Sequence, residues 1–312
     1  MSGKSMVRRM RKIAERILPR SRLVQAWTGW CLWKSRKARR VFASAGNEPA
    51  FLGWEELDRL QKTCPPFPYD YHYDDASTRK RGEERAGELR YLLGQDWSSL
   101  HDFLELGTWD GMTCAALKRL GKRTVGIDIS ARGLAKQARE NGAVFLQMRG
   151  EEAGLKDDAF DCVFSFNSFE HFSDPEGVLR EALRVVRPGG YLYFRFGPLY
   201  WSPKGMHQFK TVNVPYHQCL FPMDLFQAYA EREGIPLGNR FPPNGWTVDQ
   251  YRKLWRHYSN RMARLFCHEI LDAGHVDMIL RYPSCFKSKC RNFDNFLVAH
   301  MEALFRKREG VS

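Results

Sequence analysis

The chain has 312 residues, 43% of them hydrophobic and 27% charged, a composition that suits a globular protein with a substantial core in one or two domains. It contains no run of about 18 uncharged apolar residues, so we expect no membrane-spanning helix. The eight cysteines are scattered without a Cys-x-x-Cys motif, which predicts a cytoplasmic protein with free thiols and neither a disulfide scaffold nor a metal site.

Charge divides the chain into two parts. Residues 1–47 carry thirteen Lys and Arg against one acidic residue, Glu15, and so hold nearly all of the net charge of +13. Residues 48–312 are close to neutral, which argues against nucleic acid as the partner of this part. We therefore predict a basic N-terminal extension followed by one larger domain.

The extension is amphipathic. Apolar residues at helical spacing predict a helix over residues 1–18, and a second amphipathic stretch carries Trp27 and Trp30 ahead of the basic run 34–40. A basic amphipathic pair of this kind can lie on an anionic membrane surface, here through its first 40 residues, which would make the protein peripheral to a membrane. The alternatives are a helix packed on the body, a flexible arm, a cleaved transit peptide or an RNA-binding arm.

An irregular segment is predicted between the extension and the rest of the chain. Residues 43–47 suit a linker, and residues 49–75 are rich in Pro and aromatic residues, where each Pro fixes φ and removes an N–H donor. Residues 77–93 follow as a predicted helix, with Ala86 and Leu89 on one face.

From His101 onward, predicted strands and helices alternate, which is typical of a mostly parallel sheet with helices on both faces. The strands are 101–107, 124–129, 143–148, 161–167 and 191–196, and the helices are 111–120, 131–141 and 175–186. After Gly197 the alternation stops, and residues 198–219 are predicted to form a lid within a substrate-binding insert of about residues 198–260. Helices over 222–233 and 247–266, and strands over 275–281 and 295–301 that complete the sheet, are predicted beyond it.

The turn after the first strand is the candidate binding site. Gly107 and Gly111 allow close approach of a ligand, at the place where open α/β sheets bind nucleotides. Asp128 ends the next strand, 21 residues after Gly107, where a carboxylate can accept hydrogen bonds from both ribose hydroxyls of an adenosine. Trp109 replaces the second Gly of the dinucleotide motif, and Glu105 places negative charge before the turn. Both departures favour a cofactor other than NAD, and the charge of Glu105 suits a cationic one.

With these residues the chain resembles class I S-adenosylmethionine-dependent methyltransferases, specifically the methyltransferase type 11 group. The resemblance runs from about residue 101 to residue 197. Its motifs are ELGTWDG at 105–111, GID at 126–128, FDCVFS at 160–165, FEHF at 169–172 and RVVRPGG at 184–190. It implies a Rossmann-like sheet, S-adenosyl-L-methionine as cofactor, and methyl transfer as the reaction.

The resemblance also implies cofactor-binding roles for the matching residues. The methionine part of the cofactor would lie near Glu105, Gly107 and Thr108, with Gly111 giving close approach of the helix. The ribose would be held by Asp128, the adenine would lie against Ile129 and near Glu151 and Glu152, and Asn167 would line the side where the methyl group is transferred.

Methyl transfer to a hydroxyl group requires a base that removes the hydroxyl proton. His171 is the first candidate, because histidine titrates near neutral pH and this one follows the fourth strand. The alternative is that Glu170 and His171 form a structural pair. His207 and His217, in the predicted lid, are further candidates, unless they only form hydrogen bonds within the lid.

The acceptor is indicated mainly by what the fourth strand lacks. It has no Asn/Asp-Pro-Pro-Tyr motif, which enzymes that methylate amino groups of nucleic-acid bases use to orient a planar nitrogen. We therefore predict methyl transfer to an oxygen or carbon of a small molecule, or of a lipid- or glycan-linked acceptor. The alternatives are an RNA methyltransferase that uses the basic extension, and a non-catalytic cofactor-binding protein.

Overall fold

The computed structural model describes residues 20–67, 72–208, 210–237 and 242–310. Its centre is a seven-stranded sheet with the order β3-β2-β1-β4-β5-β7-β6. The strands are β1 Asp102–Leu106, β2 Arg123–Asp128, β3 Val144–Gln147, β4 Phe160–Phe166, β5 Val186–Phe196, β6 Met262–Leu271 and β7 Val298–Lys307. The first five are parallel, whereas β7 runs antiparallel to both β5 and β6. The strand order reverses between β1 and β4, the place where open α/β sheets bind ligands.

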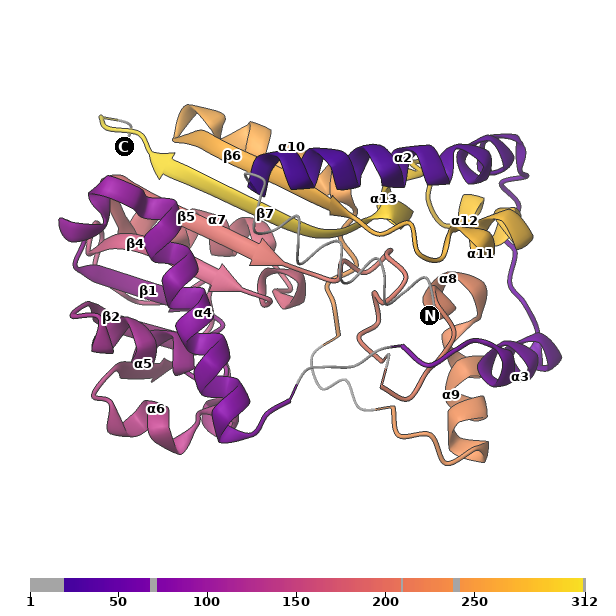
Figure 1. Cartoon of the computed structure of the whole chain (residues 1–312), viewed down its shortest axis with the longest axis horizontal. Helices are drawn as coiled ribbons and strands as arrows, with labels where there is room; N and C mark the ends of the chain where they lie inside the picture. The colour runs from indigo at the N-terminus through magenta and orange to yellow at the C-terminus, as the bar shows by residue number, and fades with distance from the viewer. Residues whose placement is uncertain (1–19, 68–71, 209, 238–241, 311–312) are drawn as a thin grey trace.

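Helices cover both faces of this sheet, so the predicted α/β architecture is confirmed (Figure 1). Phe164 of β4 packs with Leu89 of α4 (Asp75–Leu93) and with α5 (Met112–Arg119) on one face. Its neighbour Val163 packs with Leu179 of α7 (Pro175–Val185) and with α10 (Val248–His257) on the other face. Successive side chains of a strand point to opposite faces, which is why a continuously apolar strand such as β4 is buried on both sides.

Side-chain caps explain where two of these helices begin. The Asp174 side chain accepts a hydrogen bond from the Gly177 N–H at 2.9 Å, and Pro175 occupies the first turn of α7, where its missing donor costs nothing. Thr247 and Gln250 form a reciprocal capping box at the start of α10.

The N-terminal extension ends in a helix that packs on the body. This helix, α2 (Arg20–Ser44), lies along β6 and contacts α11 (Val276–Arg281) and α12 (Pro283–Lys287) (Figure 1). Its buried face carries Cys31, Ala38 and Phe42, and the Trp27 indole N–H donates to the Leu271 carbonyl at 2.7 Å. Trp30 and Trp33 are on the outer side, 41% and 63% exposed.

The helix predicted over residues 1–18 lies outside the described residues. Membrane association of the extension therefore stays a prediction. Among the helices of the four described ranges, none is both long and apolar enough to cross a membrane.

The segment 49–75, predicted to be irregular, contains a helix, α3 (Trp54–Thr63). Leu57 and Leu60 are fully buried one turn apart, and this short helical period is hidden in the sequence by the Pro and aromatic residues around it. The Gln61 amide donates to the Thr211 carbonyl at 3.1 Å, so α3 holds the predicted lid.

Several boundaries predicted in the second half of the chain are wrong. The helix predicted over 247–266 ends at His257, and β6 begins at Met262. The strand predicted over 275–281 is helix α11, and the strand predicted over 295–301 begins as helix α13 (Asp294–Leu297) before β7 runs on to Lys307. Short apolar runs fit both helical and strand periods. Pairing between β6 and β7 decides the outcome for those two strands, and packing on α2 decides it for α11.

Three further α-helices lie in the described ranges, besides short 3-10 helices. Only residues 136–140 of the helix predicted over 131–141 form a regular helix, α6 (Lys136–Glu140). The remaining helices are α8 (His217–Leu220) and α9 (Met223–Arg232).

Replacing Phe42 by Ala tests whether α2 is part of the folded body. The Phe42 ring is 3% exposed and makes edge contacts with Phe293 and Phe296, so its loss leaves a cavity. We expect Phe42→Ala to lower the free energy of unfolding in urea by about 3 kcal/mol or more. The exposed Trp33→Ala serves as the control and should change it by less than about 0.5 kcal/mol. Equal small effects of both would mean that α2 does not pack on the body in solution.

Candidate functional site

A cavity of about 660 Å³ opens at the carboxyl ends of the central strands. Its lining comes from the loops after β1, β2 and β4 and from the segment after β5, and includes Gly107, Trp109, Asp128, Ile129, Asn167, His171, Lys204 and His207. The volume lies within the range of about 300–1,000 Å³ that is usual for small-molecule sites. The reversal of strand order thus coincides with a cavity large enough for a cofactor.

The turn after β1 requires glycine at position 107. Gly107 has φ +72°, and a Cβ there would lie 2.4 Å from the Cβ of Ser168. The Ser168 hydroxyl donates to the Gly107 carbonyl at 2.9 Å. The loops after β1 and β4 therefore pack directly on each other, and no larger side chain fits between them.

The Glu105 side chain stabilises this turn through hydrogen bonds. Its side chain is fully buried, and its Oε2 accepts hydrogen bonds from the Thr108 hydroxyl at 2.8 Å and the Cys114 thiol at 3.3 Å. Burial raises the pKa of Glu105 to about 7. Gly111, with φ +71°, is closely surrounded by apolar side chains from the loop after β2 and from β3. None of Glu105, Thr108 and Gly111 lines the large cavity, so these three shape the turn.

Asp128 does line the cavity, at the end of β2. Its Oδ2 accepts the Trp109 N–H at 2.9 Å, and its Oδ1 accepts the Ser130 N–H at 3.0 Å. Burial raises its pKa, although these backbone donors oppose the shift. A carboxylate has about four lone-pair sites, so each oxygen can accept a further hydrogen bond from a ligand.

Two partly exposed apolar residues stand beside Asp128. Ile129 is 51% exposed and Trp109 is 37% exposed, and both line the cavity. Trp109 takes a left-handed φ of +45°, and a Cβ at Gly133 would lie 2.6 Å from its indole ring. The ring thus lies over Gly133. Because Gly133 has no side chain, there is room for Trp at turn position 109, which usually holds Gly.

Of the other predicted cofactor residues, some line the cavity and some do not. Asn167 lines the cavity with φ +51°, and its N–H donates to the Arg195 carbonyl at 2.8 Å. Glu151 forms an ion pair with Arg149, and Glu152 is exposed; neither lines the cavity, although Gly150 between them and β3 does. The structure therefore brings Asp128, Ile129 and Asn167 to the cavity and leaves the two glutamates outside it.

The segment after β4 is held rigidly. Phe169 is fully buried among Phe194, Phe196, Tyr251 and Trp255. The Asn244 side chain donates to the carbonyls of Phe169 and Phe172 at 3.3 and 3.0 Å, and the Asn244 N–H donates to the Glu170 carbonyl at 2.7 Å. Glu170 and His171 are thus fixed from both sides at the edge of the cavity.

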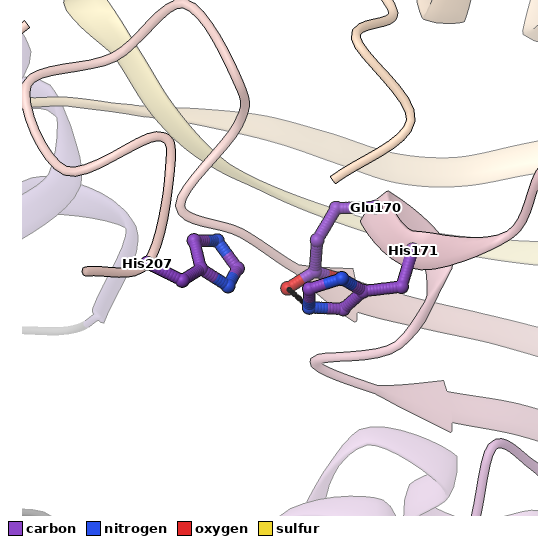
Figure 2. A group of neighbouring side chains, drawn as sticks. All are labelled: Glu170, His171 and His207. Carbon is purple, nitrogen blue, oxygen red and sulfur yellow. Dashed lines mark ion pairs between the residues drawn. The ribbon is translucent and has the colours of Figure 1, made fainter. Parts of the chain in front are cut away.

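The structure brings two of the three candidate histidines together. The rings of His171 and His207 lie with their centroids 4.8 Å apart, and both line the cavity (Figure 2). Burial, with the nearby His171, lowers the pKa of His207 to about 3.

His217 lies elsewhere, within the packing of the predicted lid. Its Nε2 is 3.0 Å from the Gln208 side-chain oxygen, and its ring stacks on Phe226. Burial lowers its pKa to about 4. This position favours a structural role, and the catalytic assignments of all three histidines stay predictions.

Some lining residues escaped the sequence interpretation. Arg85 of α4 is 7% exposed, with its guanidinium 5.0 Å from the Phe166 ring, and His300 of β7 has a pKa lowered to about 4 by burial. Both reach the cavity only through tertiary packing, so no local pattern marks them. Lys204 and Lys210 also line it, and only their place within the predicted lid pointed to them.

Replacing Gly107 by Ala tests the turn. We expect Gly107→Ala to weaken S-adenosylmethionine binding in calorimetry by roughly tenfold or more, because the new Cβ pushes the loops after β1 and β4 apart. Gly121→Ala is the matched control, since Gly121 has a similar φ of +80° but no atom within 4 Å of the added Cβ. Both variants carry the same backbone strain, so equal affinities would show that the Gly107 packing is irrelevant to binding.

Several known proteins are similar to this chain. The family described as "Methyltransferase domain" matches residues 104–194. A ubiquinone biosynthesis O-methyltransferase of Aeromonas salmonicida is 30% identical over 163 residues, which cover 44% of this chain and 68% of that protein. Its namesake in Brucella ovis is 28% identical over 134 residues, which cover 36% of this chain and about half, 54%, of that protein. A solved S-adenosylmethionine-dependent methyltransferase of Mesorhizobium loti is 16% identical, with a TM-score of 0.44, over 70% of this chain and 96% of that one.

The cavity fits the cofactor of this family. Asp128 offers the cavity a carboxylate whose oxygens can each accept a further hydrogen bond, and glycine at position 107 keeps the turn beside it free of a side chain. The match to the family begins within β1 and ends within β5, so it spans the strands whose ends form the cavity. The chain belongs to the class I S-adenosylmethionine-dependent methyltransferases, and S-adenosyl-L-methionine is its cofactor.

Proposed function

We propose that this methyltransferase methylates a hydroxyl oxygen of a small-molecule acceptor or of a lipid- or glycan-linked one. The observation that carries the proposal is a cavity lined both by Asp128 and by the His171 and His207 side chains. The two O-methyltransferases similar to this chain support oxygen over carbon as the atom that is methylated.

The cofactor side of the cavity would be formed by the residues around the turn. Asp128 would hold the ribose, Ile129 and Trp109 would contact the adenosine, and Gly107 would give the backbone close approach to the methionine part. The cofactor supplies a methyl group that is already activated by a positively charged sulfur. The contribution of the protein is therefore to align the acceptor and to allow its proton to leave.

The acceptor side is closed by the segment after β5, which is well anchored. The Tyr216 hydroxyl donates to the Phe296 carbonyl at 2.7 Å, and the Leu199 N–H donates to the Ala299 carbonyl at 2.7 Å. Lys204 and Lys210, carried by this segment, line the cavity. Two lysine side chains in the lining favour an acceptor with an anionic group, such as a carboxylate or phosphate, near its hydroxyl.

The histidines differ in their suitability as a base. A general base works best when its pKa is near the working pH, so the pKa of about 3 makes His207 a weak base at neutral pH. The neutral imidazole of His207 is instead suited to hydrogen bonding or to ligation of a metal ion. His171 remains the first candidate among the three for a side chain that acts directly on the acceptor.

Transfer of a labelled methyl group into a cell extract tests the proposed acceptor. With the full chain and methyl-labelled S-adenosylmethionine, we expect label in the lipid or small-molecule fraction, in a product that withstands mild alkali as an ether does. Heat-denatured protein provides the background. Label confined to the RNA fraction would contradict the proposal. An alkali-labile product would also contradict it, because a methyl ester is cleaved by mild alkali and the methyl ether of a hydroxyl group is not.

A further inference from the structure

We infer that Glu170, His171 and His207 bind a divalent transition-metal ion at the acceptor side of the cavity. One carboxylate oxygen of Glu170 and one nitrogen of each ring lie within 4.8 Å of one another. Figure 2 shows the two rings and the carboxylate converging, with Glu170 and His171 after β4 and His207 on the segment after β5. The three side chains offer two nitrogens and one oxygen, a donor set that suits Zn²⁺, Fe²⁺ or Co²⁺ better than Mg²⁺ or Ca²⁺.

Glu170 is the strongest indication that a cation belongs here. Its side chain is 1% exposed, and among the described residues neither carboxylate oxygen accepts a hydrogen bond of normal geometry. His171 Nε2 is 3.9 Å from Oε1, and the N–H groups of Glu170 and Gly197 offset the burial only in part. Burying a carboxylate costs free energy unless the group is paired or coordinates a metal, so a bound cation would offset the cost of burying Glu170.

His207 is prepared as a metal ligand by its backbone contact. Its Nε2 lies 2.8 Å from the Pro198 carbonyl oxygen, which can only accept, so Nε2 must carry the proton. Nδ1 then keeps its lone pair, and the ring is turned toward Glu170 and His171 (Figure 2). Metal-bound histidines almost always donate their second ring N–H in this way, because that bond fixes the tautomer and the ring orientation.

The distances require only a small adjustment. Ligand atoms at about 2.1 Å from a tetrahedral ion are about 3.4 Å apart, so the three atoms would need to approach by about 1.4 Å at most. The backbone of Glu170 and His171 is held by the buried Phe169 ring and by Asn244, and the Pro198 contact holds the His207 ring, so small changes in the side-chain torsions of all three residues would supply the movement. Three protein ligands leave a coordination position open, as in catalytic zinc sites.

Because His171 and His207 both line the cavity, the open position would face the acceptor. Its role there rests on the proposed O-methyl transfer: the ion would hold the acceptor oxygen and lower the pKa of its hydroxyl group, as zinc does for bound water, so that the proton would leave to solvent water as the oxygen takes the methyl group. The binding of the ion does not rest on that function. The sequence predicted no metal site, because the two histidines are 36 positions apart and show no local spacing.

Metal titration of the full chain tests this inference. Chelator-treated protein saturated with S-adenosylhomocysteine is titrated with Zn²⁺ in a calorimeter and with Co²⁺ in a spectrophotometer. We expect one equivalent to bind, with Co²⁺ absorption bands typical of low coordination number. Glu170→Gln keeps the size of the side chain but removes its charge, and His207→Gln removes the second ring; each should weaken binding by roughly 100-fold. His257→Ala, on the exposed side of α10, is the control and should bind as the natural protein does.

The outcomes separate this inference from the proposed function. No heat and no Co²⁺ spectrum, in protein that still binds S-adenosylhomocysteine, would overturn the metal site and leave the proposed O-methyl transfer standing. Equal affinity of Glu170→Gln, His207→Gln and His257→Ala would also overturn it, since the ion would then bind elsewhere. Inhibition of methyl transfer by one equivalent of Zn²⁺ would contradict the catalytic role of the ion and favour His171 as a base. A failure to detect any acceptor would count against the proposed function alone.

Discussion

Two carboxylates, the buried Glu105 and the partly buried Asp128, fix the turn between β1 and α5, and the cavity depends on that turn. Glu105 accepts hydrogen bonds from the Thr108 hydroxyl and the Cys114 thiol. Asp128, at the end of the neighbouring strand β2, accepts a hydrogen bond from the Trp109 N–H. Each carboxylate therefore holds a different part of one short loop. Gly107 then lets Ser168 pack against this loop, so the ends of β1, β2 and β4 meet as one surface. A ligand that binds here meets a surface already arranged for it, and little order must be created on binding.

The part of the fold that could be predicted is the part determined by local patterns. Strands such as β4 combine an apolar run with a following helix signal, and Asp174-Pro175 marks the start of α7. What could not be predicted depends on distant partners. Residues 262–266 suit a helix in isolation but pair with β7, and Val276–Arg281 suits a strand but packs against α2.

The site divides in the same way. Gly107, Asp128 and His171 follow strands whose ends must meet at one edge of a parallel sheet, so their meeting could be predicted from chain order. Arg85 and His300 reach the same cavity from α4 and the antiparallel β7, where no motif marks them. The sequence left open whether the N-terminal extension lies on a membrane, packs on the body or forms a flexible arm. Helix α2 packs its apolar face on the body, because a helix of 25 residues with a buried stripe gains stability from packing.

The central claim is that the cavity at the end of β2 binds the adenosine part of S-adenosylmethionine through Asp128. Calorimetry of the full chain with S-adenosylhomocysteine, for the natural protein and for Asp128→Ala, tests it most directly. The account predicts one bound molecule and an affinity lowered roughly 10- to 100-fold by the substitution, because charge-assisted hydrogen bonds to the ribose are lost. Unchanged affinity in Asp128→Ala, or no binding by folded natural protein, would contradict it.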